Sequence, residues 1–130
     1  MSDKNLLIDT QSFIWFAENN PKLPTYVRNI MEDEKYNLFI SIASLWEIVI
    51  KSSLGKLELK KDISEIINGV SKSGFSILQI GLQHLITLHG LEYLHKDPFD
   101  RIIISQAITE NMPLVSSDQN FNKYKIIVIS

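Results

Sequence analysis

Apolar residues gather in short runs along the chain, and longer stretches with helical spacing separate these runs. Short apolar runs bounded by polar or turn residues are typical of buried strands. We predict strands over residues 5–8, 38–40, 75–80, 114–116 and 126–129. The stretches between them have helix length, and Gly55 and Gly74 supply stop signals. We predict helices over residues 11–17, 23–34, 42–54, 62–72, 82–93 and 98–111.

The order of these elements predicts the fold class. Short strands that alternate with helices favour parallel β-α-β units, with helices on both faces of one sheet. No repeat, low-complexity tract or linker divides the 130 residues, a length that is usual for one domain. We therefore expect a single three-layer α/β/α domain over residues 1–130, with a parallel sheet of about five strands. Ligands of such sheets bind at the carboxyl ends of the strands.

Composition narrows the class of protein. Hydrophobic residues make up 45% and charged residues 22%, as in ordinary globular proteins. The absence of cysteine excludes disulfides, thiolate zinc sites and a cysteine nucleophile. The first residues lack the pattern of a signal peptide, and the apolar runs are shorter than the roughly 18 residues of a membrane span. We expect a cytoplasmic protein with no membrane segment.

Two aspartates directly follow predicted strands. Asp9 follows the apolar run 6–8, and Asp118 follows the run 114–117. Either residue could simply cap a helix or a turn, because aspartate favours both positions. Strand ends of a parallel sheet share one edge, however, so this placement also predicts that the two carboxylates lie in one site.

Two further acids lie on the expected inner faces of helices. Glu47 shares a helix face with Ala43 and Ile50, and Asp100 shares one with Ile103 and Ala107. A carboxylate on an apolar face is expensive to bury unpaired, which favours a functional role. For Glu47 the alternative is a surface ion pair at spacing i,i+4, worth about 0.3–0.5 kcal/mol.

The segment around residue 97 carries two competing interpretations. Asp97 fits a helix N-cap with Pro98 at the first helical position, and Asp100 then takes the third position, as in a capping box. We interpret Asp97 as structural first and catalytic second, and Asp100 the other way round.

Four converging carboxylates require a cation, because neighbouring like charges raise one another's pKa. Mg²⁺ prefers oxygen ligands and combines one or two carboxylates with substrate phosphate, and such sites activate water for phosphodiester cleavage. The histidines His84, His89 and His95 do not have the i,i+4 helical spacing of a zinc site. We expect His84 and His89 to be ordinary helix residues.

Four segments together resemble the PIN-domain nucleases, specifically the VapC-type toxins of bacterial toxin–antitoxin pairs. They are LLIDT (6–10), SIASLWEIVIKSSLGKLEL (41–59), HKDPFDRIIISQA (95–107) and LVSSDQNF (114–121). The resemblance covers nearly the whole chain, and the four segments have the order and spacing of the family. Close relatives often have Asp-Thr-His after the first strand, whereas this chain has Gln11, so any role of that histidine is not carried over.

The resemblance implies a metal-dependent endoribonuclease that uses Mg²⁺ or Mn²⁺. By position, the catalytic and metal-binding acids are Asp9, Glu47, Asp100 and Asp118, and Asp97, Thr10 and Ser116 are secondary candidates. It also implies a homodimer and a cognate antitoxin that inserts a peptide segment near the acidic pocket.

The charge pattern adds a candidate RNA-binding surface. The net charge is −2, but it becomes 13 − 11 = +2 when the four acids are set aside. Four lysines fall in one short stretch and are candidates for binding RNA phosphates: Lys51, Lys56, Lys60 and Lys61. The alternative is an ordinary solvated face. We expect Trp15 and Trp46 to lie in the core rather than to stack on bases.

Three other classes of protein share part of this pattern. An aspartyl-nucleophile phosphatase needs a second aspartate at position 11, where this chain has Gln11. A receiver domain needs a mid-chain strand that ends in aspartate, whereas the middle strands here end near Ser41 and Ile80. A catalytically silent PIN-like RNA-binding or interaction module is the remaining alternative, and the intact set of four acids argues against it.

Overall fold

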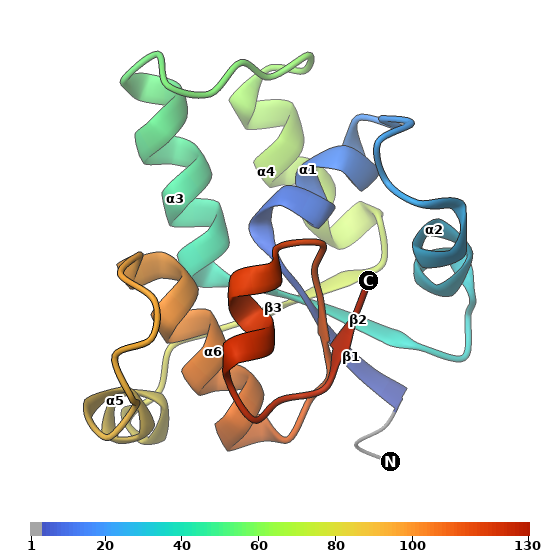
Figure 1. The fold of residues 1–130 in the computed structure, drawn as a ribbon. Coiled ribbons are helices and arrows are strands. Elements are labelled where there is room, and N and C mark those ends of the chain that lie inside the picture. The colour runs from blue at the N-terminus through green and yellow to red at the C-terminus, as the bar shows by residue number, and fades with distance from the viewer. Residues whose placement is uncertain (1–3) are drawn as a thin grey trace.

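The computed structural model describes residues 4–130. Its strands are β1 (Asn5–Ile8), β2 (Asn37–Ser41), β3 (Phe75–Leu78), β4 (Leu114–Val115) and β5 (Val128–Ile129). Its helices are α1 (Thr10–Ala17), α2 (Thr25–Glu32), α3 (Ile42–Ser53), α4 (Ile63–Lys72), α5 (Leu82–His89), α6 (Pro98–Glu110) and the 3-10 helix η2 (Gln119–Lys123). Figure 1 shows these elements as one three-layer body, which confirms the predicted fold class.

The sheet is parallel throughout, with strand order β3-β2-β1-β4-β5. The chain moves outward from β1 through β2 to β3, and later returns to the other side of β1 through β4 and β5. The strand order therefore reverses between β1 and β4. In open α/β sheets, ligands bind in the crevice at the carboxyl ends of the strands beside such a reversal.

Each face of the sheet has its own apolar core, because side chains of a strand point alternately to opposite faces. Leu6 and Ile8 of β1 pack with side chains of α1, α2 and α4. Leu7 points the other way and packs with α6 and with Phe121 of η2. In Figure 1, α5 and α6 accordingly lie on one side of the sheet and α1, α2 and α4 on the other. Helix α3 contributes to both cores and contacts α1 and α6.

Several elements are shorter than the pattern predicts. Helix α2 begins at Thr25 rather than at residue 23, because Pro24 is its N-cap. Helix α5 ends at His89 rather than at residue 93, because the chain leaves the helix at Gly90. Strand β3 ends at Leu78 rather than at residue 80, and strand β5 begins at Val128 rather than at residue 126.

One expected core residue lies on the surface. Trp46 is 59% exposed and contacts the ring of Phe99 edge-on at 5.2 Å, whereas Trp15 is partly buried against the core, as expected. Leu45 and Ile48 are the residues that α3 buries in this core, so the core face of the helix is already filled without Trp46. Among the helices of residues 4–130, none has the length and apolar character needed to cross a bilayer.

Candidate active site

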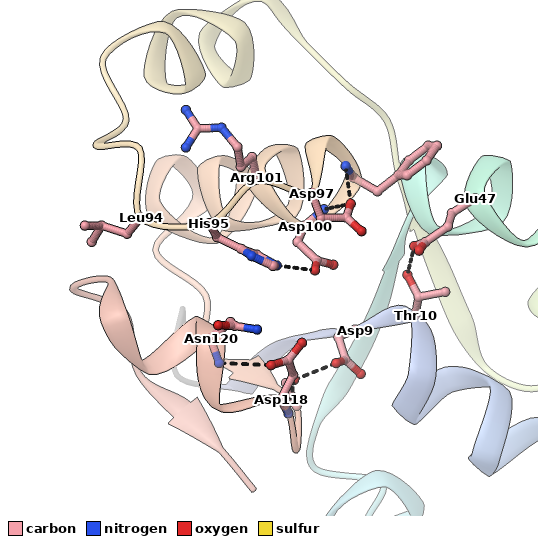
Figure 2. Close-up of polar contacts among 12 residues, drawn as sticks. Asp9, Thr10, Glu47, Leu94, His95, Asp97, Asp100, Arg101, Asp118 and Asn120 are labelled. Atoms are coloured by element: carbon pink, nitrogen blue, oxygen red, sulfur yellow. Dashed lines mark hydrogen bonds and ion pairs between the residues drawn. The ribbon is translucent and has the colours of Figure 1, made fainter.

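The four predicted acids line one pocket of about 330 Å³, beside the reversal between β1 and β4. They come from the junction of β1 and α1, from α3, from α6 and from the segment after β4, and Figure 2 shows them around a common space. The pocket wall comprises Asp9, Thr10, Gln11, Ile14, Glu47, Ile48, Lys51, Leu57, Asp97, Asp100, Ser117, Asp118 and Phe121. Thus all four carboxylates converge, as the positions of the strand ends and helix faces predict.

Asp9 is both a helix cap and a site carboxylate. Its Oδ1 accepts a hydrogen bond from the backbone N–H of Ser12 at 2.8 Å, which caps α1. Its Oδ2 accepts a hydrogen bond from the hydroxyl of Ser116 at 2.5 Å. The side chain is buried, and desolvation raises the pKa of Asp9 although both serines act to lower it. The carboxylate of Asp9 therefore caps α1 and also lines the pocket, and its catalytic role stays a prediction.

Asp118 is tied to Asp9 through Ser116. The hydroxyl oxygen of Ser116 accepts the backbone N–H of Asp118 at 3.0 Å. The Asp118 carboxylate caps η2 by accepting the N–H of Asn120 at 2.9 Å, but the residue remains exposed at the mouth of the pocket. Ser116, a secondary candidate from the sequence, thus links the acids at the ends of β1 and β4.

Glu47 is buried, yet it also forms the ion pair that was its alternative role. Its Oε1 accepts a hydrogen bond from the hydroxyl of Thr10 at 2.8 Å (Figure 2), and its Oε2 pairs with Lys51 Nζ at 2.6 Å. The hydrogen bond to Glu47 is the main reason that the pKa of Lys51 is raised. The carboxylate is held from two sides, by α1 and by its own helix.

Asp97 and Asp100 have different hydrogen-bond partners at the start of α6. Asp97 is the N-cap, and its Oδ1 accepts the backbone N–H groups of Phe99 at 2.8 Å and Asp100 at 3.2 Å. Asp100 Oδ2 lies 2.6 Å from His95 Nε2 (Figure 2). Burial raises the pKa of Asp100 to about 6, and the charges of Asp97 and Glu47 add to the shift.

His95 lies at the site, although we did not predict this from the sequence. A ligand atom from each of His95, Asp100 and Asp118 lies within 4.8 Å of the others. His95 lies in the segment between α5 and α6, so spacing within a helix could not reveal it. The sequence feature that could have indicated its place at the site is its position two residues before Asp97, the N-cap of α6.

The donor set fits a hard divalent cation. Carboxylate oxygens are the ligands that Mg²⁺ and Mn²⁺ prefer. Five acids line the pocket and Lys51 is its one lysine among the described residues. Burial raises the pKa of both Asp9 and Asp100, because it disfavours their ionised forms. Positive charge near these carboxylates would stabilise the ionised forms. A cation would supply it.

The four candidate RNA-binding lysines do not share one position. Lys51 lines the pocket, whereas Lys56, Lys60 and Lys61 lie on the segment between α3 and α4. The backbone N–H of Lys60 donates to the carboxylate of Glu18, and Lys61 lines a different, smaller cavity beside α4. Their role in RNA binding stays a prediction.

Comparison with known proteins identifies the family. The PIN domain matches residues 6–127, so the chain belongs to the PIN domain family, as the sequence motifs indicated. No curated protein gives a significant sequence match.

Solved structures with the same fold include three toxin–antitoxin complexes. One is VapBC2 from Rickettsia felis bound to a promoter DNA fragment, with 17% identity and TM-score 0.72 over 96% of this chain and 97% of that chain. A toxin–antitoxin complex from Klebsiella pneumoniae has 17% identity and TM-score 0.64 over 96% of both chains. VapBC-1 from nontypeable Haemophilus influenzae has 16% identity and TM-score 0.63 over 97% of both chains. At these identities, the likeness establishes the fold.

Proposed function

We propose that this protein is a divalent-metal-dependent endoribonuclease and the toxin of a toxin–antitoxin pair. The observation that carries the proposal is the convergence of Asp9, Glu47, Asp100 and Asp118 on one pocket beside the β1–β4 reversal. The raised pKa of two of these acids supports a site that is completed by a cation. Membership of the PIN domain family supports phosphodiester cleavage as the reaction.

Asp9, Asp100 and Asp118 are the residues that would hold Mg²⁺ or Mn²⁺, with Glu47 beside them. When bound, such an ion activates water and stabilises the charge that develops on a phosphodiester. Ser116 orients the carboxylate of Asp9, and Thr10 orients that of Glu47.

We assign to Lys51 the contact with the substrate. Its ammonium lies 2.6 Å from Glu47 Oε2, and its side chain is 41% exposed at the pocket wall. It offers a positive charge to a backbone phosphate that approaches the acids, and phosphate contacts of this kind supply much of the affinity for nucleic acid.

The toxin role rests on likeness to solved toxin–antitoxin complexes over nearly the full length of both chains. We place the protein in the cytoplasm, with an antitoxin that binds near the acidic pocket and a second copy as homodimer partner. A surface for a protein partner is supported by exposed apolar side chains on α3 and α5, which are Trp46, Val49, Leu82, Leu85 and Ile86.

A metal-titrated ribonuclease assay tests the proposal. Purified protein is incubated with structured RNA in Mg²⁺ or Mn²⁺, with excess chelator in a parallel reaction, and Asp9→Asn is the matched control. Asparagine can still cap α1, so the variant loses the charge but keeps the cap. Cleavage should require the metal and fall sharply in the variant. Undiminished cleavage in chelator would rule out the metal mechanism, and RNA that is bound but never cut would favour the silent binding module.

A further inference from the structure

We propose that His95 is a positioning residue of the acidic site, which donates a hydrogen bond to Asp100 and holds that carboxylate beside Asp118. The inference rests on the proposed function, because it assigns a role in assembling the proposed cation site. The contact joins His95 Nε2 to Asp100 Oδ2 at 2.6 Å, and the two side chains are only 16% and 17% exposed. Such a short contact between two largely buried side chains orients both of them.

The segment that carries His95 is fixed by Arg101 of α6. The guanidinium of Arg101 donates to the carbonyl of Leu91 at 3.2 Å and to that of Glu92 at 3.1 Å. It also lies over the ring of Tyr93, 4.5 Å from the centroid. Arg101 follows Asp100 directly, so one turn of α6 supplies both the carboxylate and the group that holds the histidine segment (Figure 2).

Tyr124 also holds this segment. Its hydroxyl donates to the carbonyl of Glu92 at 3.0 Å and accepts the N–H of Leu94 at 3.1 Å. The ring of His95 also lies edge-on to that of Phe121, with centroids 6.4 Å apart. Phe121 is 1% exposed and Tyr124 is 8% exposed, so packed groups set the position of the imidazole.

The position matters because Asp100 lies among like charges. The charges of Asp97 and Glu47 both act on the Asp100 carboxylate, and repulsion favours a rotation of that side chain away from the other acids. A donated N–H on Oδ2 opposes this rotation. Within residues 4–130 the Asp100 side chain forms no other hydrogen bond, so His95 is its sole directional restraint there.

Direct ligation by the imidazole nitrogen is the competing role, because the His95, Asp100 and Asp118 ligand atoms lie within 4.8 Å of one another. A ligand needs the nitrogen lone pair, whereas a positioning residue needs the N–H. Glutamine at this position can present an amide N–H at the reach of Nε2 but offers no nitrogen lone pair to a metal, although its carbonyl oxygen could bind one. His95→Gln and His95→Ala therefore test whether the side chain at this position contributes to metal binding, and nitrogen coupling to bound Mn²⁺ in the unaltered protein decides between positioning and ligation by the imidazole.

The experiment measures Mn²⁺ affinity by calorimetry for the full chain and for His95→Gln, His95→Ala and His89→Ala. His89 is exposed on α5 and lies outside the pocket, so His89→Ala is the matched control. We expect His95→Ala to weaken Mn²⁺ binding about 10- to 100-fold, the usual cost of losing a partner of a ligating side chain. His95→Gln should recover most of that loss, and His89→Ala should bind as the unaltered chain does.

Pulsed electron paramagnetic resonance of bound Mn²⁺ supplies the second readout. We expect no strong coupling to a directly bonded nitrogen in the unaltered protein. Such a coupling would overturn the positioning role and make His95 a ligand, and equal affinities of His95→Ala and the unaltered chain would overturn any role. Suppose that the Mn²⁺ affinities and the absence of nitrogen coupling are as expected, but that the unaltered chain never cuts RNA. The proposed function then fails, while the inference about His95 stands.

Discussion

The hydroxyl of Ser116 donates to the buried carboxylate of Asp9 across the boundary between β4 and β1, at 2.5 Å. Its oxygen also accepts the N–H of Asp118 at 3.0 Å. One small side chain therefore couples the acid that ends the first strand to the acid that follows the fourth. Because Ser116 is 1% exposed, water has little access to replace these bonds.

We predict that Ser116→Ala weakens the site through Asp9. The hydrogen bond from Ser116 lowers the pKa of Asp9, so its loss should raise that pKa further and disfavour the charged form that binds metal. Mn²⁺ affinity should fall about 10-fold or more, as for other losses of a partner to a ligating group. Calorimetric titration checks this, with the exposed Ser53→Ala as control. An unchanged Mn²⁺ affinity would contradict the coupling.

The stability of the metal-free protein should depend on pH through Asp100. Its pKa is raised from 3.8 to about 6 in the folded chain, so between these values the folded state keeps a proton that the unfolded state has lost. Stability from this group is therefore greatest below the unfolded pKa and declines as pH rises toward 6. Chemical unfolding of the metal-free protein at several pH values measures the slope. Asp100→Asn should flatten it, and an equally steep slope in that variant would contradict the assignment.

The lysines provide a separate prediction on RNA binding. Replacing Lys56, Lys60 and Lys61 by alanine removes three cations from the segment between α3 and α4. If all three meet phosphates, the slope of log affinity against log salt should become shallower by about 2, since each contact to a single strand contributes about 0.7. Filter binding at several salt concentrations checks this on a catalytically inactive Asp9→Asn background. A slope equal to that of the lysine-bearing protein would mean that the three lysines are only solvated.

The exposed apolar surface predicts an oligomer. Leu85 of α5 is 48% exposed and lies with Trp46 and Phe99 around an apolar cavity of about 250 Å³. If a second copy covers this surface, Leu85→Lys places an unpaired charge in the interface and should shift the protein to monomer. Sedimentation equilibrium measures the mass, with the exposed Lys72→Ala as control. A variant that keeps the mass of a dimer would locate the interface elsewhere.

Much of the fold and of the site could be predicted from local patterns. Apolar runs identify strands, and residues that follow strands fall at one edge of a parallel sheet, so Asp9 and Asp118 were predictable. Helix faces placed Glu47 and Asp100 on the inner side for the same kind of reason.

Contacts between distant segments were not accessible in this way. The interaction of Thr10 with Glu47 joins residues 37 positions apart, and the packing that orients His95 depends on Phe121 and Tyr124 of a later segment. The exposure of Trp46 was missed because a tryptophan in an apolar helix has the same local pattern whether it faces the core or a partner surface. Tertiary packing decides each of these cases.

Asp97 and Asp100 provide the last prediction, because their bonding separates a cap from a site acid. Asp97 accepts two backbone N–H groups at the start of α6, so Asp97→Ala should cost about 0.5–2 kcal/mol of stability and leave substantial cleavage. Asp97→Ser should restore most of that stability, since a hydroxyl can accept the same bonds. Asp100→Asn should nearly abolish cleavage and leave metal-free stability equal or higher, because it removes a buried charge from among other acids.

Thermal melts without metal, paired with cleavage assays on the same preparations, distinguish the two roles. Asp97→Ala should lower the melting temperature while it leaves substantial cleavage activity. Asp100→Asn should lower the cleavage activity without lowering the melting temperature. An Asp100→Asn protein that is destabilised but fully active would reverse the assignment. The reversed result is physically distinct, because it would require the Asp100 carboxylate to stabilise the fold through His95 rather than to complete a cation site.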